Sequence, residues 1–204
     1  MEQQLKLAEQ ALLVQADLRL DDLDNILGSM LIHQLDYADL YFHSSRSESW
    51  FLEDGQVKEG SYDIDQGVGV RAVSGDKTGL AYSDEILLPA LQEAANMARA
   101  ITRQGGQGKI QVWKKTVGNQ LYSPADPLAV LSPVEKIQLM EAADQEARQM
   151  DARVKQVMVS LAGVHEIVLI AASDGTFCAD IRPLVRMNVS VVVEHQGRRE
   201  QGSS

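Results

Sequence analysis

Residues 50–57 read Trp50-Phe51-Leu52-Glu53-Asp54-Gly55-Gln56-Val57, in which an Asp-Gly pair separates two strand-like arms. This pattern predicts a β-hairpin, because both central residues of the favoured two-residue turn need positive φ angles, which Asp and Gly tolerate. Before the hairpin, alternation puts Leu40 and Phe42 on one side of a strand that begins at Tyr37. After it, residues 67–73 and 78–82 predict two more strands joined by a turn. This part of the chain is therefore predicted to be an antiparallel meander.

Helical signals flank these strands. The opening segment is predicted to be helical, and apolar residues with helical spacing run from Leu23 to Leu31, after the candidate N-caps Asp21 and Asp22. A further helix has Pro89 in its first turn and ends before the glycine cluster at 105–108. Ser132-Pro133-Val134-Glu135 is a capping box with proline at the first helical position, and it starts a helix predicted to reach about residue 150.

Three more strands are predicted at residues 154–163, 166–173 and 185–193, with a turn at Asp174-Gly175-Thr176. A helix followed by strands thus occurs twice, at 21–82 and 132–195, which predicts an α+β fold of antiparallel sheets with helices packed on one face. We expect sub-units at about 1–104 and 132–204, joined by a connector at about 105–131 with a short strand at 110–113. The last hairpin, near His195, has hardly started its second arm when the sequence ends. We therefore expect the chain to be part of a longer protein.

Composition excludes several classes of protein. The chain has 204 residues, 45% hydrophobic and 24% charged, which is typical of a globular protein with a real core. No apolar run approaches the roughly 20 residues of a membrane-spanning helix, and the N-terminus lacks a signal peptide pattern, so we expect no membrane association and a cytoplasmic location. Residues 1–65 hold 4 Lys or Arg and 14 Asp or Glu, and carry the whole net charge of −10. A chain without a basic cluster is not expected to bind nucleic acid.

The residues taken by themselves predict no catalytic site. The four histidines lie at least nine residues apart, so none forms the closely spaced pair of a helical zinc motif, and His165-Glu166 lies in a predicted strand. Gly67-Val68-Gly69 continues into a strand rather than a helix that could receive a phosphate. Asp63 and Asp65 project from one side of a strand, either as a carboxylate pair or, as we favour, as a solvated acidic edge. Cys178 is interpreted as a buried small residue rather than a reactive thiol.

Two stretches nevertheless closely resemble the N-terminal region of the TldD/PmbA family, and its TldD branch in particular. The first runs from Gly60 to Gly79 and includes Asp65-Gln66-Gly67-Val68-Gly69-Val70-Arg71. The second contains Ala172-Ser173-Asp174-Gly175-Thr176 and Asp180-Ile181-Arg182-Pro183-Leu184-Val185-Arg186. Residues 39–42, 48–50 and 52–54 support the same resemblance, which is collinear and spans nearly the whole chain.

The resemblance implies a cytoplasmic bacterial zinc metallopeptidase, from a family also called modulators of DNA gyrase, that cleaves unfolded or extended peptides as a heterodimer with a PmbA/TldE subunit. The family holds zinc with a His-Glu-x-x-x-His motif and a later cysteine, and its glutamate acts as general base on zinc-bound water. Nothing in this sequence matches that motif, and Cys178 is not that ligand. We therefore expect no catalytic or metal residue in this chain, and expect the C-terminal metallopeptidase domain to lie outside it.

The resemblance also marks residues whose role is open. Gln66, Gly67, Gly69 and Arg71 are candidates for a strand that lines a peptide cleft or a subunit interface, either by strand addition or, as we favour, with glycines that only allow tight sheet packing. Arg71, Arg182 and Arg186 pair either with acids of this chain, which we favour, or with a partner. Asp65, Asp174 and Gly175 are further signature positions. An assembly module that docks the PmbA/TldE subunit without touching substrate is the alternative function.

Overall fold

The computed structural model describes residues 2–31, 35–101, 113–115 and 121–204. Its elements follow the predicted alternation of helices and strands. In chain order they are α1 (Glu2–Ala8), the π-helix η1 (Glu9–Leu13), the 3₁₀-helix η2 (Val14–Ala16), α2 (Leu20–Leu31), β1 (Tyr37–Glu53), β2 (Gln56–Ser74), β3 (Lys77–Ser83), α3 (Leu88–Ile101), β4 (Lys114–Lys115), α4 (Pro133–Met150), β5 (Val154–Ala172), β6 (Thr176–His195) and β7 (Arg198–Ser203).

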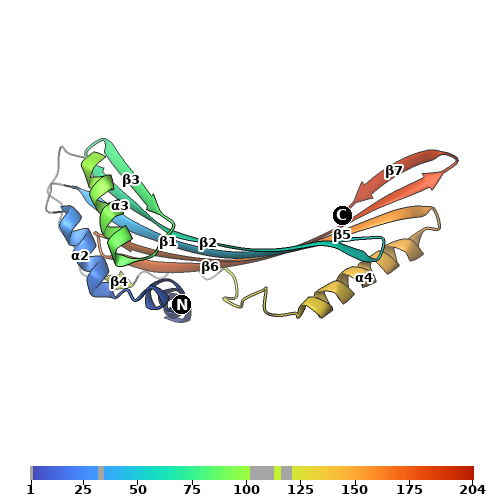
Figure 1. The fold of residues 1–204 in the computed structure, drawn as a ribbon, viewed down its shortest axis with the longest axis horizontal. Coiled ribbons are helices and arrows are strands. Elements are labelled where there is room, and N and C mark those ends of the chain that lie inside the picture. Colours follow the sequence, from blue (N-terminus) through green and yellow to red (C-terminus); the bar gives the residue numbers. More distant parts are fainter. Residues whose placement is uncertain (1, 32–34, 102–112, 116–120) are drawn as a thin grey trace. The chain divides into compact units, whose positions relative to one another are not determined.

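Seven strands of the described residues form one sheet, in the order β3-β2-β1-β5-β6-β4, with β7 paired to β6 (Figure 1). β2 pairs antiparallel with β3, and β6 pairs antiparallel with β7, whereas the two residues of β4 run parallel to β6. The predicted α+β class is therefore confirmed. The short strand predicted at 110–113 lies mostly outside the described residues, as does the glycine cluster at 105–108, and β4 begins at Lys114.

The predicted hairpin turns are confirmed by their backbone angles. Asp54 and Gly55, which join β1 to β2, have φ angles of 50° and 73°. Gln196 and Gly197 join β6 to β7 with φ angles of 49° and 78°. Positive φ at both central residues is the type I′ geometry that matches the twist of antiparallel strands. The predicted C-terminal hairpin thus exists, and its second arm pairs residues 198–203 with residues 190–195.

The strands are longer than predicted. The separate strands expected at 154–163 and 166–173 are one strand, β5, and the strand expected at 67–73 is the second half of β2, which begins at Gln56. Gly163 does not turn the chain. An added Cβ there would lie 2.7 Å from Leu128 Cδ2, so this glycine instead lets a neighbouring loop approach the strand.

The helix starts follow capping chemistry. Ser132 Oγ accepts a hydrogen bond from the backbone N–H of Glu135 at 3.3 Å, and the Ser132 N–H donates to Glu135 Oε2 at 2.7 Å, which confirms the capping box of α4. The expected N-caps of α2, Asp21 and Asp22, are wrong in that role, because both lie inside the first turn of the helix. α2 begins at Leu20, and Asp22 accepts from the Arg19 N–H from within the first turn.

Contacts divide the chain into two compact units that are interleaved along the sequence. Unit 1 comprises Met1–Ser45, Asp65–Pro124 and Glu166–Arg182, and unit 2 comprises Arg46–Ile64, Ala125–His165 and Pro183–Ser204. β1, β2, β5 and β6 contribute residues to both units because each of these strands is long. These units are defined by contacts within the structure. The expected division of the sequence into sub-units at about 1–104 and 132–204 stays a prediction.

Each unit has its own hydrophobic core. In unit 1, α2 and α3 pack on one face of the sheet through apolar side chains that include Leu27 and Leu91, which are completely buried. They meet alternate residues of β1 and β2, such as Phe42 and Val70. In unit 2, Met140 of α4 packs on Val157 and Val159 of β5. None of the described helices is long and apolar enough to span a bilayer.

Candidate functional site

One face of the sheet in unit 1 carries none of the described helices, and most of the candidate residues lie on it. Along β1, Leu40 and Phe42 point into the core, so Tyr41 and His43 point to the opposite face. The same alternation holds in β2, β5 and β6, where Val70, Leu169 and Phe177 belong to the core. We call the opposite surface the open face. Its residues include Tyr37, Asp39, Tyr41 and His43 of β1, Asp65, Gly67, Gly69 and Arg71 of β2, Leu80 and Tyr82 of β3, Glu166 and the buried Val168 of β5, and Cys178, Asp180 and Arg182 of β6.

Arg71 is held on the open face by an ion pair and an aromatic ring. Its Nε donates to Asp39 Oδ2 at 2.8 Å, its Nη2 donates to the same oxygen, and its guanidinium lies 5.5 Å from the centre of the Tyr37 ring. Burial raises the pKa of Tyr37 to about 12, with further contributions from the charges of Asp39 and Asp174. The interpretation of Arg71 as paired within the chain is therefore supported, although about half of its side chain is exposed.

A second charged group crosses from β1 to β6. His43 Nε2 lies 3.4 Å from Glu166 Oε1, and Arg182 Nη1 donates to the same oxygen at 3.3 Å. Arg182 Nε also donates to Asp180 Oδ2 at 2.7 Å, and this hydrogen bond raises the pKa of the guanidinium. Sequence reasoning placed His43 on this side of the strand but missed its pairing with Glu166, because cross-strand register cannot be inferred from one sequence.

Gly67 and Gly69 differ in what surrounds them. A Cβ on Gly67 would lie 2.6 Å from Tyr82 Oη and 2.7 Å from the backbone oxygen of Ser83, so the strand pair could not hold its present spacing. A Cβ on Gly69 would have no atom nearer than 4.0 Å. Tight packing therefore accounts for Gly67 and not for Gly69, and the missing side chain at Gly69 leaves the open face accessible at that point.

Strand addition at Gly67 to Val73, one of the two alternatives for this strand, is wrong. Residues 68–74 of β2 pair with β3, and β2 also pairs with β1, so Gly67 to Val73 is not a free edge to which a peptide strand can be added. Gln66 lies on the face of β2 opposite to Gly67. It lines a pocket of about 320 Å³ with η1 and η2 residues, including Leu12 and Gln15, on the helix-covered side.

The remaining signature positions have local roles. Asp174 Oδ1 accepts from the Thr176 N–H at 2.9 Å, and Gly175 has a φ angle of 87°, so this pair builds the turn between β5 and β6. Arg186 lies in unit 2, where its Nε donates to Asn188 Oδ1 at 3.2 Å, so its partner among the described residues is an amide and not the expected acid. Cys178 is half-buried rather than buried, and burial raises the pKa of its thiol, which disfavours the reactive thiolate.

The residues of the described segments do not fit a zinc ion. No group of three or more His, Cys, Asp or Glu side chains within them is placed to hold a metal. Three protein ligands are the minimum of an ordinary catalytic zinc site. What the open face offers chemically is therefore hydrogen bonding, charge and apolar contact, the last from Leu80 and Tyr82, whose side chains are largely exposed.

Unit 2 contains a separate polar cluster around His165. Arg46 Nη2 donates to Asp126 Oδ2 at 2.8 Å and lies 3.1 Å from His165 Nδ1. Because arginine can only donate, Nδ1 must accept and the proton of the neutral ring is assigned to Nε2, which is buried without a partner among the described residues. Burial lowers the pKa of His165, and the charge of Arg46 adds to this effect while Asp126 opposes it.

The free energy of unfolding is expected to fall as the pH drops below the ordinary imidazole pKa of 6.5. A pKa that is lower in the folded state means that the unfolded chain binds the proton more tightly, so acid favours unfolding. Urea titrations at pH 7, 6 and 5 measure this. The variant His165→Asn, which keeps an acceptor for Arg46, should lose less stability over this range than the matched variant His195→Asn, altered at an exposed histidine. Equal losses in the two variants would refute the assignment.

Comparison with known proteins places this fold in a family. Residues 38–102 match the model of the PmbA/TldA metallopeptidase domain 1, and residues 126–204 match that of the PmbA/TldA metallopeptidase central domain. A metalloprotease TldD homolog of Haemophilus influenzae is 48% identical over 194 residues, which cover 94% of this chain and 40% of that protein. The homolog of Buchnera aphidicola subsp. Schizaphis graminum is 42% identical over 200 residues, which cover 98% of this chain and 41% of that protein. The chain thus spans about two fifths of the length of these relatives.

Solved structures share the fold at low sequence identity. A proposed modulator of DNA gyrase from Bacteroides thetaiotaomicron aligns with a TM-score of 0.68 and 16% identity, over 88% of this chain and 42% of that one. TldE from Thermococcus kodakarensis aligns with a TM-score of 0.66 and 16% identity, over 90% of this chain and 42% of the TldE chain. The sequence resemblance is confirmed by both family models and by the named relatives. The chain belongs to the TldD/PmbA family of metallopeptidases.

Proposed function

We propose that this chain is the non-catalytic N-terminal region of a TldD-like zinc metallopeptidase, which cleaves unfolded or extended peptides together with a PmbA/TldE subunit. The observation that carries the proposal is its 48% identity to a protein named as a metalloprotease, over a stretch whose described residues contain no group of metal ligands. Zinc and the general base then belong to the remainder of the parent protein. The role of this chain is to provide a surface that contacts the peptide or the partner subunit.

The open face of unit 1 is the surface that we assign to the peptide. Its arginines are already paired, so it offers exposed but oriented polar groups, and Gly69 leaves room for a main chain to approach. Contacts of this kind depend little on the sequence of the peptide, which suits a peptidase for unfolded substrates.

The alternative is an assembly module that docks the PmbA/TldE subunit without substrate contact. It is favoured by the largely exposed Leu80 and Tyr82 at the β3 edge of the open face, because aromatic and aliphatic side chains concentrate in subunit interfaces. The similarity of this chain to a TldE structure makes a pseudo-symmetric pairing of related folds reasonable.

The variant Gly69→Phe, made in the full-length protein produced with its PmbA/TldE-like partner, separates the two functions. Gly202→Phe is the matched control, because Gly202 also lies in a strand with open space around it. We expect Gly69→Phe to slow cleavage of an unfolded polypeptide by at least about tenfold, with the heterodimer intact on size-exclusion chromatography. Loss of the heterodimer would favour the assembly module. Unchanged cleavage in both variants would contradict the proposal that this face meets the peptide.

A further inference from the structure

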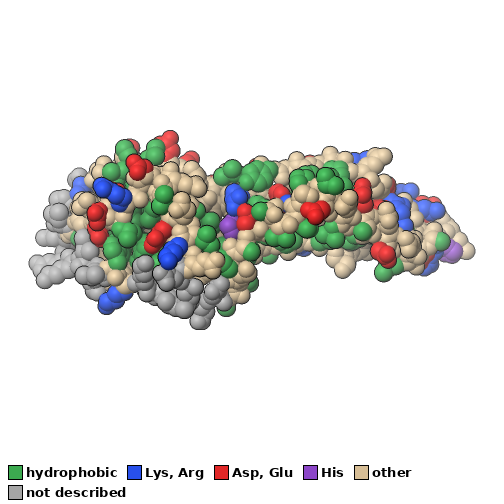
Figure 2. Space-filling view, turned by 90° about the horizontal axis from the view of Figure 1, so that it is seen from below, with side chains coloured by type: hydrophobic (Ala, Val, Ile, Leu, Met, Phe, Trp, Pro, Cys, Tyr) green, Lys and Arg blue, Asp and Glu red, His purple; other side chains and the backbone are tan. Residues whose placement is uncertain are grey.

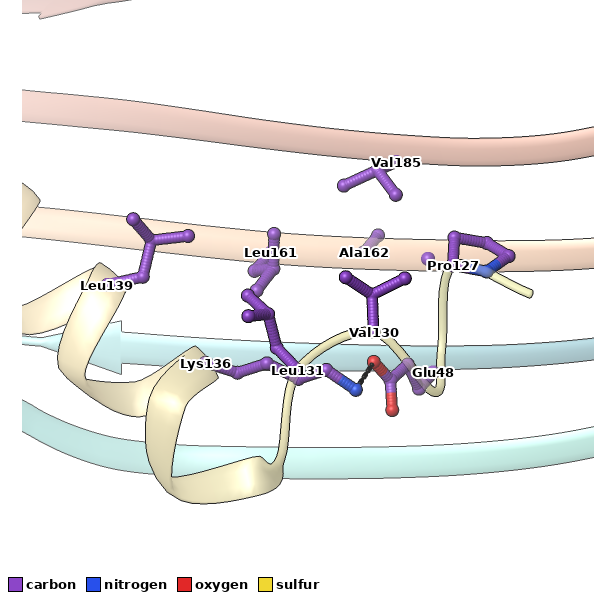
Figure 3. Close-up of a pocket in the computed structure, with 10 residues that line it drawn as sticks. Glu48, Pro127, Val130, Leu131, Lys136, Leu139, Leu161, Ala162 and Val185 are labelled. Carbon is purple, nitrogen blue, oxygen red and sulfur yellow. Dashed lines mark ion pairs between the residues drawn. The ribbon is translucent and has the colours of Figure 1, made fainter. Parts of the chain in front are cut away.

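A pocket of about 190 Å³ lies in unit 2, between the sheet, the loop before α4 and the first turns of that helix (Figure 3). Most of the side chains that line it are aliphatic. They include Val130 and Leu131 of the loop, Leu139 of α4, Leu161 of β5 and Val185 of β6. An apolar cavity of about 150 Å³ accepts a benzene molecule. The pocket is therefore large enough for one leucine or phenylalanine side chain.

One end of the pocket carries a buried ammonium group. Lys136 is only 5% exposed, and its Nζ lies 2.5 Å from Glu48 Oε1 and donates to the backbone oxygen of Leu128 at 2.7 Å (Figure 3). A lysine has three N–H donors. These two acceptors, the ones found among the described residues, leave one N–H for a further acceptor. Because Lys136 and Glu48 neutralise each other, the lining as a whole suits an uncharged guest.

The mouth of the pocket is apolar and accessible. Val130 and Val185 are more than half exposed, and Leu139 is 45% exposed. On the face of unit 2 that α4 covers, hydrophobic side chains reach the surface between charged ones (Figure 2). A stable protein–protein interface buries roughly 800 Å² on each partner. A concave site for a single side chain is far smaller than that and fits a chain that inserts one residue.

We infer that this pocket binds a leucine- or phenylalanine-size side chain of an extended peptide, whose adjacent backbone carbonyl accepts from Lys136. The inference rests on the proposed function, since it takes the peptide to be the guest of this family member. It adds a preference that the open face does not provide: peptides that carry a large apolar residue at the matching position are held in unit 2. Peptides of small or charged residues lack this contact.

Methyl NMR on the full-length protein, produced with its PmbA/TldE-like partner, tests the inference with two blocked amino acids, N-acetyl-leucine methylamide and N-acetyl-glycine methylamide. We expect the leucine probe to shift the methyl signals of Leu139 and Leu161 in a saturable way, and the glycine probe to leave them in place. The variant Val130→Trp fills the mouth and should weaken the leucine probe by at least about tenfold. Val134→Trp is the matched control, because Val134 is equally exposed in the same region but does not line the pocket.

Each other outcome overturns the inference. Equal shifts with both probes, or equal weakening in both tryptophan variants, would mean that the pocket does not select a side chain. Concentration-dependent sedimentation that Val130→Trp abolishes would mean that a second copy of the chain occupies it. This test measures binding and not cleavage. A negative result would therefore reject the pocket without affecting the Gly69→Phe experiment, and a negative Gly69→Phe experiment would not change the binding measured here.

Discussion

Replacing Lys136 by methionine is expected to lower the free energy of unfolding by about 3 kcal/mol or more, because it leaves one charge of a buried pair without its partner. Glu48 would keep its carboxylate in an environment where its side chain is 13% exposed, and the Leu128 carbonyl would lose its donor. Urea denaturation followed by circular dichroism measures the change, with methionine chosen because it keeps the aliphatic stem that lines the pocket.

The double variant Glu48→Leu with Lys136→Met provides the control for this prediction. Removing both charges together also removes the uncompensated carboxylate, so the double variant should recover a large part of the lost stability. Exposed ion pairs contribute at most about 1 kcal/mol to the free energy of unfolding. If Lys136→Met alone lowered this free energy by less than that, the ion pair would be solvated and the pocket would be open to water at that end.

The variant Gly67→Ala is expected to destabilise the protein by about 1 to 3 kcal/mol, because the new methyl group overlaps the neighbouring strand. Tyr82 is mostly exposed and its ring can swing away, but the backbone oxygen of Ser83, 2.7 Å from the new carbon, cannot move without disturbing the pairing of β2 with β3. Thermal and urea unfolding of the variant measure the effect.

Gly69→Ala is the matched control two residues along the same strand. The new methyl group meets nothing within 4.0 Å, and alanine costs less backbone entropy than glycine, so stability should stay the same or rise by up to about 1 kcal/mol. If the two variants lost the same stability, the distinction between a packing glycine and an accessible one would be wrong, and with it the assignment of Gly69 to a binding surface.

Local rules predicted the hairpin turns and the start of α4 from the sequence. Asp54-Gly55 and the Ser132 capping box both depend on residues within four positions of each other, and both were confirmed. Strand lengths could not be predicted in the same way. Gly163 and Gly60 look like interruptions in the sequence, but one accommodates Leu128 and the other lies against the Trp50 ring, so β5 and β2 run through them.

The candidate site could be predicted only in part. Alternation along β1 correctly put Tyr41 and His43 on the face opposite Leu40 and Phe42. The pairs Arg71 with Asp39 and Lys136 with Glu48 join residues 32 and 88 positions apart, and no spacing rule connects them. The pocket of unit 2 was missed for the same reason, because its lining comes from β1, the loop before α4, α4, β5 and β6.

The family resemblance supplied what the residues alone could not. The signature positions Asp174 and Gly175 build a turn, which gives them a structural role in the fold. Arg71 and Arg182 bridge strands of the open face, which is compatible both with a structural role and with a binding surface. The proposed peptidase activity of the parent protein therefore rests on sequence similarity to named relatives and not on a set of catalytic groups among the described residues.

Zinc content and peptide cleavage, measured on the purified 204-residue chain beside the full-length protein with its PmbA/TldE-like partner, test the central claim most directly. We predict that the complete assembly retains stoichiometric zinc after dialysis and cleaves an unfolded polypeptide in a chelator-sensitive manner. The 204-residue chain by itself should do neither. Tightly held zinc or chelator-sensitive cleavage by this chain alone would contradict the claim that it supplies binding surface while the catalytic groups lie elsewhere in the parent protein.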